Sequence, residues 1–272
     1  MPTVSELLKT ASRHVDRYDA RVLLAHLLNC RKESFIAHPN RQVNNETASQ
    51  FLDQINRVAL GYPVPYLTQQ QGFWSRQFYV TPDVLIPRPD TETVIEKILE
   101  ITRWRPTLSI LDLGTGSGCI AITLALEVPQ ASVTATDASQ SALEVARENA
   151  TRLKAEHIDF RLGSWYEPIG KQTFDIIVSN PPYIVPNDPH LPALRYEPQS
   201  ALTDGVDGLS HIRTIVTQAP AHINPDGWLL LEHGYDQGKQ VRELLRTSHF
   251  IEVDTIKDYG GNERITFGHI PA

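Results

Sequence analysis

The sequence predicts an α/β protein: a doubly wound, Rossmann-like sheet of seven strands with a C-terminal antiparallel hairpin, preceded by a small N-terminal helical domain. Three observations predict this architecture. Apolar residues recur at helical spacing up to about residue 60, short strand signals follow, and helical and strand patterns alternate after Pro89. Such alternation is typical of a parallel sheet with helices on both faces.

The N-terminal helical domain is expected over residues 1–70, because no strand signal interrupts its helical periodicity. A β-hairpin linker is expected over residues 71–88. Its two short strands would cover residues 73–80 and 84–86 and join at residues 81–83, since aromatic and β-branched residues favour strands and a Thr-Pro-Asp sequence favours a turn.

The sheet domain is expected over residues 89–272. A helix over residues 91–102 precedes its first strand, and Pro225-Asp226-Gly227 turns into the fifth. The strands are expected at residues 109–113, 132–136, 158–162, 174–179, 228–232, 251–257 and 263–268. The other helices are expected after the glycine-rich loop that follows the first strand and at residues 139–153, 209–219 and 237–247.

Length and composition indicate an ordinary globular protein, with 272 residues of which 41% are hydrophobic and 21% charged. No apolar stretch approaches the roughly 20 residues that cross a bilayer, and the N-terminus lacks the features of a signal peptide. We therefore expect a cytoplasmic protein that does not bind membranes. We also expect a monomer, although no sequence feature decides this. Cys30 and Cys119 have no partners at metal-ligand spacing and the histidines form no HExxH pattern, so no metal is expected.

The net charge of −7 argues against binding to nucleic-acid phosphates, which normally requires a basic surface. The nearest basic cluster, Arg103-Trp104-Arg105, is short and is expected to be a solvated linker. No direct nucleic-acid partner is therefore expected, whereas an acidic chain could be steered toward a basic protein partner.

Asn180-Pro181-Pro182-Tyr183 directly follows a strand signal and is the most informative motif of the chain. Two prolines remove two backbone donors and hold φ at about −65°, so the turn is stiff and presents acceptors. The Asn180 side-chain oxygen and the Pro181 carbonyl can each accept one N–H bond, while the Tyr183 ring stacks on the planar group. The motif predicts a site that binds a planar nitrogen group, with Asn180, Pro181 and Tyr183 as catalytic residues and Pro182 as a further substrate-binding residue. The alternative is an ordinary proline-rich turn.

A glycine-rich loop, Gly114-Thr115-Gly116-Ser117-Gly118, follows the first strand and opens a helix. Its three glycines remove side chains and permit positive φ, so a ligand can approach the backbone. Its spacing is shorter than the dinucleotide fingerprint, which argues against a dehydrogenase and favours a methionine-bearing nucleoside. We predict that all five residues bind this cofactor.

Two further candidate cofactor residues follow the next strands. Asp137 ends the second strand, where a carboxylate can accept bonds from both ribose hydroxyls or can cap the next helix. We favour ribose binding because Ser139 also offers a capping oxygen. Trp165 follows the third strand, where an indole could stack on adenine or belong to the core, and the pattern leaves both roles open.

Further motifs carry a family resemblance. They are Ile86-Pro87-Arg88-Pro89-Asp90-Thr91-Glu92, Tyr196-Glu197-Pro198 with Ala201-Leu202, Gly205 with Asp207-Gly208-Leu209, Leu231-Glu232-His233-Gly234, and Asp258-Tyr259-Gly260 with Arg264. Together with the glycine loop, Asp137 and residues 180–183, they resemble the release factor glutamine methyltransferases, the HemK/PrmC family of S-adenosylmethionine-dependent class I methyltransferases. This family also has a small N-terminal helical domain and a linking hairpin. One departure is Asp90, where the family usually has glutamate.

The resemblance implies methyl transfer from S-adenosylmethionine, with S-adenosylhomocysteine as product, to the N5 amide nitrogen of the glutamine in the Gly-Gly-Gln motif of class I peptide chain release factors. It also implies that Arg88 and Glu92 bind substrate and that Asn180 contacts the cofactor. We further expect the N-terminal helices to dock the release factor, because its short Gly-Gly-Gln loop alone offers little recognition area. Two alternatives stay open: an adenine-N6 DNA or RNA methyltransferase, which would use the same motif on a flipped base, and a non-catalytic nucleotide-binding module.

Overall fold

The structure, a computed structural model, describes residues 1–103 and 108–271 of the chain. The second and third residues of the predicted Arg103-Trp104-Arg105 linker lie outside these described residues. The internal contacts divide the chain into two compact units, Met1–Gln70 and Gln71–Ala272.

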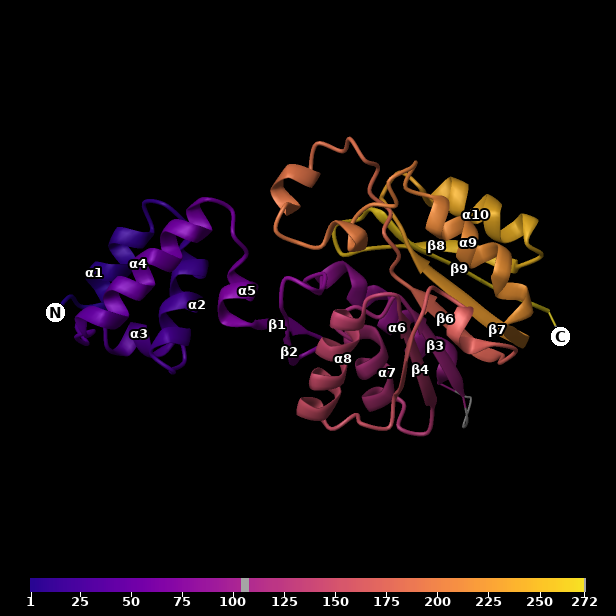
Figure 1. Ribbon diagram of the computed structural model, residues 1–272, viewed down its shortest axis with the longest axis horizontal. Helices are drawn as coiled ribbons and strands as arrows, with labels where there is room; N and C mark the ends of the chain where they lie inside the picture. Colours follow the sequence, from indigo (N-terminus) through magenta and orange to yellow (C-terminus); the bar gives the residue numbers. More distant parts are fainter. Residues whose placement is uncertain (104–107, 272) are drawn as a thin grey trace. The chain divides into compact units, whose positions relative to one another are not determined.

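The first unit is helical (Figure 1). Each of its longer helices buries one face. Its helices are α1 (Val4–Ala11), α2 (Arg17–Leu27), α3 (Ser34–Ala37), α4 (Asn45–Ala59) and α5 (Val64–Thr68). α1 begins with a capping box, in which the Thr3 hydroxyl accepts from the Glu6 N–H at 3.3 Å and the Glu6 carboxylate accepts from the Thr3 N–H at 2.8 Å. Apolar residues such as Phe51 and Ile55 form a core within this unit, which confirms the predicted N-terminal helices.

The predicted strand positions in the linker are wrong. The structure forms a tighter hairpin from β1 (Gln70–Phe73) and β2 (Arg76–Tyr79), which turns at Trp74-Ser75. Both turn residues have positive φ, 47° and 59°, as a two-residue hairpin turn that follows the strand twist requires. The expected second strand does not form, because the backbone N–H of Ile86 donates to the Glu197 carboxylate instead of to a neighbouring strand.

Seven strands of the described chain form one mixed sheet in the order β5-β4-β3-β6-β7-β9-β8. They are β3 (Ser109–Leu113), β4 (Ser132–Asp137), β5 (Asp159–Leu162), β6 (Phe174–Ser179), β7 (Ile223–Glu232), β8 (Ile251–Lys257) and β9 (Glu263–His269). Neighbours from β5 to β7 pair in parallel, whereas β9 is antiparallel to both β7 and β8. This confirms the predicted doubly wound sheet with its C-terminal antiparallel hairpin. β7 begins at Ile223 rather than at the predicted Trp228, because Ile223 already pairs with Phe174 ahead of a bulge.

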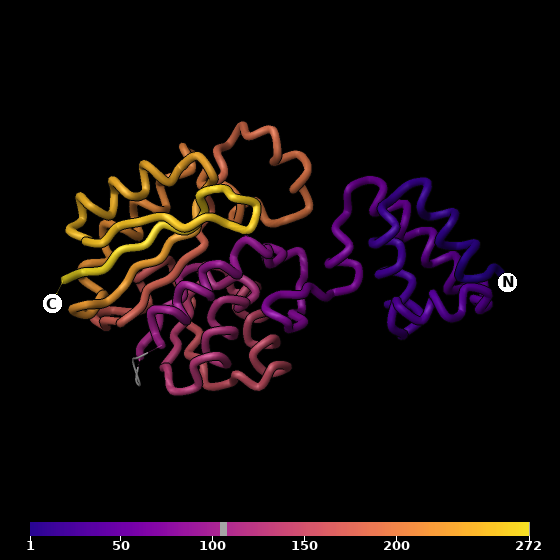
Figure 2. The backbone as a smooth tube through the Cα atoms, turned by 180° about the vertical axis from the view of Figure 1, so that it is seen from behind, coloured from indigo at the N-terminus to yellow at the C-terminus, as the bar shows by residue number. Residues whose placement is uncertain are grey.

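Helices cover both faces of the sheet (Figure 1, Figure 2). The α-helices are α6 (Glu92–Thr102), α7 (Cys119–Glu127), α8 (Gln140–Leu153), α9 (Ser210–Gln218) and α10 (Gly238–Thr247), and the short 3-10 helices are η1 (Pro89–Thr91), η2 (Glu167–Ile169), η3 (Leu191–Leu194), η4 (Gln199–Ala201) and η5 (Ala219–Ala221). Ile110 of β3 packs in one buried cluster with α6, α7 and α8, whereas its neighbour Leu111 packs in another with α9 and α10. Successive strand residues face opposite sides of a sheet, so the two helix groups lie on opposite faces. Among the described helices, none is long and apolar enough to cross a membrane.

The carboxyl ends of the parallel strands bring three predicted site segments to one edge of the sheet. β3 has β4 on one side and β6 on the other, and ligands of open α/β sheets bind where the strand order reverses in this way. The glycine loop follows β3, Asp137 ends β4, and Asn180 follows β6. Strand order therefore positions residues that are far apart in the sequence around one point.

Candidate functional site

A cavity of about 410 Å³ opens at the carboxyl ends of β3, β4 and β6. Of the predicted site residues, those that line this larger cavity are Arg88, Gly114, Thr115, Gly116, Ser117, Asp137, Trp165, Asn180 and Pro182. A smaller cavity of about 330 Å³ is lined by Pro181 and Tyr183 and again by Arg88 and Asn180. Asn180 and Arg88 therefore border both cavities.

The glycine loop exposes its backbone to the larger cavity. Gly114 and Gly116 have φ values of 72° and 54°, which favour glycine. A Cβ added at Gly116 would meet nothing within 4 Å, whereas a Cβ at Gly114 would lie 3.3 Å from the Trp165 ring. The missing side chains therefore leave open space beside Gly116 and permit close approach of the indole to Gly114.

Gly118 lies outside the lining of both cavities and has a packing role. Its φ is 80°, and an added Cβ would lie 2.8 Å from Ile122 Cδ1 and 3.2 Å from Ala146 Cβ. Ile122 belongs to α7 and Ala146 to α8, so the missing side chain lets the start of α7 approach α8. The sequence-based prediction of a cofactor contact at Gly118 did not anticipate this tight helix packing.

Asp137 joins the end of β4 to the glycine loop. Its carboxylate oxygens accept from the backbone N–H groups of Gly116 at 2.8 Å and Ser139 at 2.9 Å. Burial raises the pKa of Asp137 above its ordinary value, and the backbone hydrogen bonds oppose this shift. The cap of α8 is Ser139, whose hydroxyl accepts from the Ala142 N–H at 3.2 Å. Asp137 is thus not needed as the cap, and each of its oxygens keeps a lone pair that a ligand hydroxyl can use.

Trp165 lines the larger cavity and is partly buried. Its backbone has a φ of 48°, and its carbonyl accepts from the Thr136 hydroxyl at 3.1 Å. Its ring centroid lies 5.2 Å from that of His211 at an interplanar angle of 56°. His211 also lines the cavity, but its place on α9 gave no local signal in the sequence.

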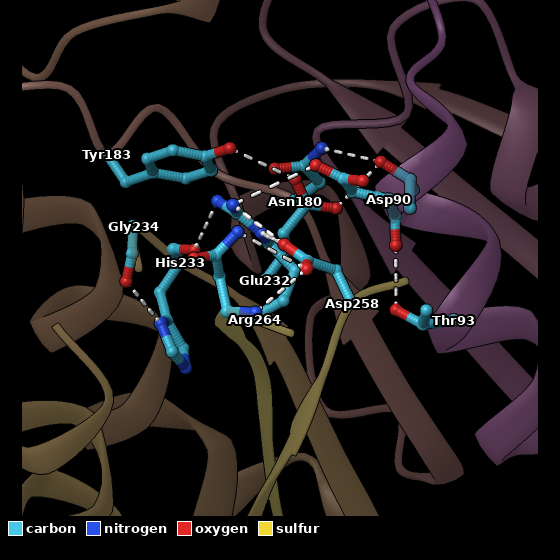
Figure 3. Close-up of polar contacts among 11 residues, drawn as sticks. Asp90, Thr93, Asn180, Tyr183, Glu232, His233, Gly234, Asp258 and Arg264 are labelled. Atoms are coloured by element: carbon cyan, nitrogen blue, oxygen red, sulfur yellow. Dashed lines mark hydrogen bonds and ion pairs between the residues drawn. The ribbon is translucent and has the colours of Figure 1, made fainter. Parts of the chain in front are cut away.

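The Asn180 amide is connected to a buried carboxylate through a threonine. Asn180 Nδ2 donates to Thr91 Oγ1 at 3.4 Å, and the Thr91 hydroxyl donates to Glu232 Oε2 at 2.7 Å. The Tyr183 hydroxyl donates to the other Glu232 oxygen at 3.1 Å. Figure 3 shows Asn180 and Tyr183 converging on Glu232, which is 2% exposed. Neither Thr91 nor Glu232 is among the site residues predicted from the sequence, although a carboxylate that ends an apolar strand is a usable signal.

Charged groups from other segments surround Glu232 (Figure 3). Arg264 donates to Asp258 through Nε at 3.1 Å and Nη2 at 3.0 Å, and its Nη2 lies 3.8 Å from an Asp90 oxygen. Burial raises the pKa of Glu232, and the charge of Arg264 opposes this rise. Burial also raises the pKa of Tyr183, so its phenol remains a hydrogen-bond donor at neutral pH.

The two predicted substrate-binding residues near the start of α6 differ in their surroundings. Arg88 lines both cavities, and its Nη2 pairs with the Glu197 carboxylate at 2.5 Å. Glu92 is absent from the lining of both cavities, and its carboxylate accepts from the Trp74 N–H at 2.8 Å. Glu92 therefore holds the hairpin turn. This contact was not predicted, because the turn was expected at residues 81–83 instead of at Trp74-Ser75.

Metal-ligand chemistry is not evident at this site. In the part of the chain that the structure describes, no group of three or more His, Cys, Asp or Glu residues could hold a metal ion. Cys119 lines the larger cavity, where burial raises the pKa of its thiol to about 12. Such a thiol is protonated at neutral pH and is a poor nucleophile.

Comparisons with known families and proteins place the chain in a family. Residues 91–194 match the methyltransferase small domain family, and residues 3–68 match the PrmC N-terminal domain family. The release factor glutamine methyltransferase of Xylella fastidiosa strain Temecula1 is 43% identical over 273 residues, covering 100% of this chain and 99% of that protein. The protein of the same name from Pseudomonas aeruginosa is 46% identical over 273 residues, covering 98% and 99%.

Two solved structures share the fold at lower identity. A methyltransferase from Pyrococcus furiosus has a TM-score of 0.56 and 20% identity, covering 81% of this chain and 99% of that one. The 16S rRNA N2 G1207 methyltransferase RsmC of T. thermophilus, in complex with AdoMet and guanosine, has a TM-score of 0.54 and 20% identity, covering 74% of this chain and 49% of that one. Both support the methyltransferase fold assignment.

Proposed function

The chain belongs to the release factor glutamine methyltransferase family, and on this basis we propose that it methylates the N5 amide nitrogen of the glutamine in the Gly-Gly-Gln motif of class I peptide chain release factors, using S-adenosylmethionine. The modification would tune translation termination. The full-length relatives do not favour the alternatives of an adenine-N6 methyltransferase or a non-catalytic module. The proposal also includes a cytoplasmic location, a monomeric state, and no direct binding of the chain to nucleic acid or membranes.

The residues around the larger cavity fit S-adenosylmethionine. Its volume of about 410 Å³ lies within the range of about 300–1,000 Å³ that is usual for small-molecule sites. The backbone of the glycine loop would border the methionine part, Asp137 would accept from the ribose hydroxyls, and Trp165 would stack on the adenine. When bound, S-adenosylmethionine supplies an electrophilic methyl group on a sulfonium sulfur.

The observation that carries the proposal is the position and orientation of Asn180. It lines both cavities, so it can face a cofactor in the larger one and an amide in the smaller one. Its Nδ2 donates one N–H to Thr91, and no hydrogen bond from another described residue occupies Oδ1. Oδ1 can only accept, and this suits an NH₂ group of the substrate.

The proposed chemistry of the chain is orientation and charge stabilisation. An amide nitrogen is a poor nucleophile because its lone pair is delocalised into the carbonyl. Asn180 Oδ1 and the Pro181 carbonyl would each accept one N–H, which holds the nitrogen in line for reaction and stabilises the positive charge that develops on it. The proton can leave after methylation, so no strong base is required beforehand. Pro182 stiffens the turn, and the Tyr183 ring covers the amide plane.

Arg88 and the N-terminal helices are each proposed to bind the release factor. Arg88 borders the smaller cavity while pairing with Glu197, so it can contact the release factor chain beside the glutamine. The helices of residues 1–70 would dock the rest of the factor, because a short loop alone offers little recognition area. Glu92 would contribute to substrate binding only indirectly, since its carboxylate holds the hairpin turn at Trp74.

A methyl-transfer assay tests the function. The purified chain is incubated with methyl-labelled S-adenosylmethionine and, in parallel, a class I release factor, the same factor with alanine in place of the motif glutamine, duplex DNA and RNA. We expect N5-methylglutamine by mass spectrometry in the unaltered factor alone. Label in nucleic acid with none in the factor would overturn the proposal.

A further inference from the structure

We propose that Thr91 and Glu232 are positioning residues, which turn the Asn180 amide so that its oxygen rather than its nitrogen faces the substrate. The inference rests on the proposed function, in which Asn180 accepts a hydrogen bond from the substrate amide. Neither residue belongs to the Asn-Pro-Pro-Tyr turn: Thr91 ends η1 and Glu232 ends β7. They determine which group donates and which accepts along a chain of hydrogen bonds that runs from Asn180 through Thr91 to Glu232.

Glu232 sets that direction because both of its carboxylate oxygens accept hydrogen bonds from hydroxyl groups. It has one hydroxyl at each oxygen, Thr91 at 2.7 Å and Tyr183 at 3.1 Å. Thr91, which borders the larger cavity, and Glu232, which borders the smaller one, are each only 2% exposed, so bulk solvent has little access to the hydrogen bond between them. The single hydroxyl proton of Thr91 is therefore committed to Glu232.

Thr91 in turn determines which end of the Asn180 amide faces it. With its proton given to Glu232, the Thr91 oxygen can only accept, and Asn180 Nδ2 donates to it at 3.4 Å. In the opposite amide orientation, Asn180 Oδ1 would face the Thr91 oxygen with no proton between them. That orientation forfeits the hydrogen bond and sets two acceptors against each other, so the chain favours Oδ1 toward the site.

The same carboxylate also fixes Tyr183, so one buried group orients two walls of the proposed substrate site. Tyr183 is held at its backbone as well, where its carbonyl accepts from Gln237 Nε2 at 3.0 Å. Glu232 thus orients both the Asn180 amide, through Thr91, and the Tyr183 phenol, through a direct hydrogen bond (Figure 3). Pre-set donors and acceptors of this kind contribute to the rate because they need no reorganisation during reaction.

Substitutions at Thr91 test the proposal. Thr91→Val keeps the shape but removes the hydroxyl, and we expect kcat on the release factor to fall about tenfold or more, with KM and S-adenosylhomocysteine affinity within about threefold of wild type. Thr91→Ser restores the hydroxyl and should recover most of the lost kcat. The matched control is Thr93→Val, which removes a buried hydroxyl that donates to the Asp90 carbonyl at 2.7 Å and has no contact with Asn180. Its kcat should stay within about twofold of wild type.

A double-mutant cycle separates positioning from general structural damage. Glu232→Gln replaces one of the two acceptors by a donor, and it should lower kcat as well. Because both changes break one chain, the double variant Thr91→Val/Glu232→Gln should be no more than about twofold worse than the poorer single variant. Losses that multiply, or a Thr91→Val enzyme with wild-type kcat, would overturn the positioning role.

A second readout does not depend on the identity of the substrate. In protein labelled with ¹⁵N-asparagine, the Asn180 side-chain NH₂ signal, assigned by its disappearance in Asn180→Ala, should shift and exchange faster with water in Thr91→Val but not in Thr93→Val. An unchanged Asn180 signal in a folded Thr91→Val protein would refute the positioning role even if the release factor were not the substrate. Absence of release factor methylation by the wild-type protein, with the expected Asn180 signals, would instead refute the proposed function alone.

Discussion

The carboxylate of Asp137 accepts a hydrogen bond from the backbone N–H of Gly116 at 2.8 Å, which ties the end of β4 to the glycine loop after β3. The same residue lines the larger cavity, so one side chain both shapes the loop and borders the proposed ribose site. Loss of this side chain should therefore affect the cofactor before it affects the release factor.

We expect Asp137→Ala to weaken S-adenosylmethionine binding about tenfold or more, because two charge-assisted hydrogen bonds to ribose and the loop contact are lost together. Isothermal titration calorimetry measures the affinity. KM for the release factor, measured at saturating cofactor, should change little. Unchanged cofactor affinity would remove the ribose assignment.

Asn180→Ala should lower kcat by about two or more orders of magnitude while cofactor binding persists, since an oriented contact to the reacting group is lost. Asn180→Asp is the informative companion, because it keeps an acceptor but cannot donate to Thr91. It should retain more activity than alanine and less than wild type. Single-turnover kinetics with bound cofactor gives the comparison, and near wild-type turnover in Asn180→Ala would contradict the proposed role.

Two glycines of one loop should respond differently to alanine. Gly118→Ala places a Cβ within 2.8 Å of Ile122 at a φ of 80°, so the free energy of unfolding should fall by about 2 kcal/mol or more. Gly116→Ala has open space but a φ of 54°, so it should lose about 1–2 kcal/mol and also intrude on the cofactor. Urea unfolding and calorimetry on both variants separate packing from binding. A larger loss of stability in Gly116→Ala would contradict the packing role of Gly118.

Removal of residues 1–68 should raise KM for a whole release factor about tenfold more than KM for a peptide of its Gly-Gly-Gln loop, because only the whole factor could use the N-terminal helices. The remaining unit has its own buried clusters, and thermal unfolding checks that it stays folded. Equal increases for both substrates would reduce those helices to a scaffold.

Activity should fall at acidic pH as Glu232 becomes protonated. Burial raises its pKa above the ordinary 4.5, so the protonated form appears as pH decreases through that raised value, and it would donate where Thr91 or Tyr183 now donates. The charges of Arg264 and Asp90 face this carboxylate and act in opposite directions. The thiol of Cys119 also interacts with it but is uncharged at neutral pH.

The pH profile of kcat needs one control, because burial also raises the pKa of Asp112 to about 7. Glu232→Gln cannot ionise at this position, so an acidic decline in kcat due to Glu232 should be absent from that variant. A decline that persists unchanged in Glu232→Gln would assign it to Asp112 or another group.

Much of the fold could be predicted because its signals are local. The strand Phe174–Ser179 and the stiff turn after it are encoded by consecutive residues, whose apolar pattern and proline geometry do not depend on distant partners. The hairpin was misplaced for the opposite reason. Its turn at Trp74-Ser75 carries no glycine or asparagine. The turn is held by Glu92, which follows Trp74 by 18 positions and lies outside the hairpin.

The sequence alone determined the order of helices and strands, the family, and the motifs that gather at the ends of β3, β4 and β6. Only the tertiary structure decided which distant residues complete the site. Thr91 and Glu232 are separated by 141 positions, and their hydrogen bond exists only because η1 and the end of β7 are brought together in the folded unit. Periodicity and turn chemistry are properties of neighbouring residues, whereas the direction of a buried hydrogen-bond chain depends on partners that the fold supplies.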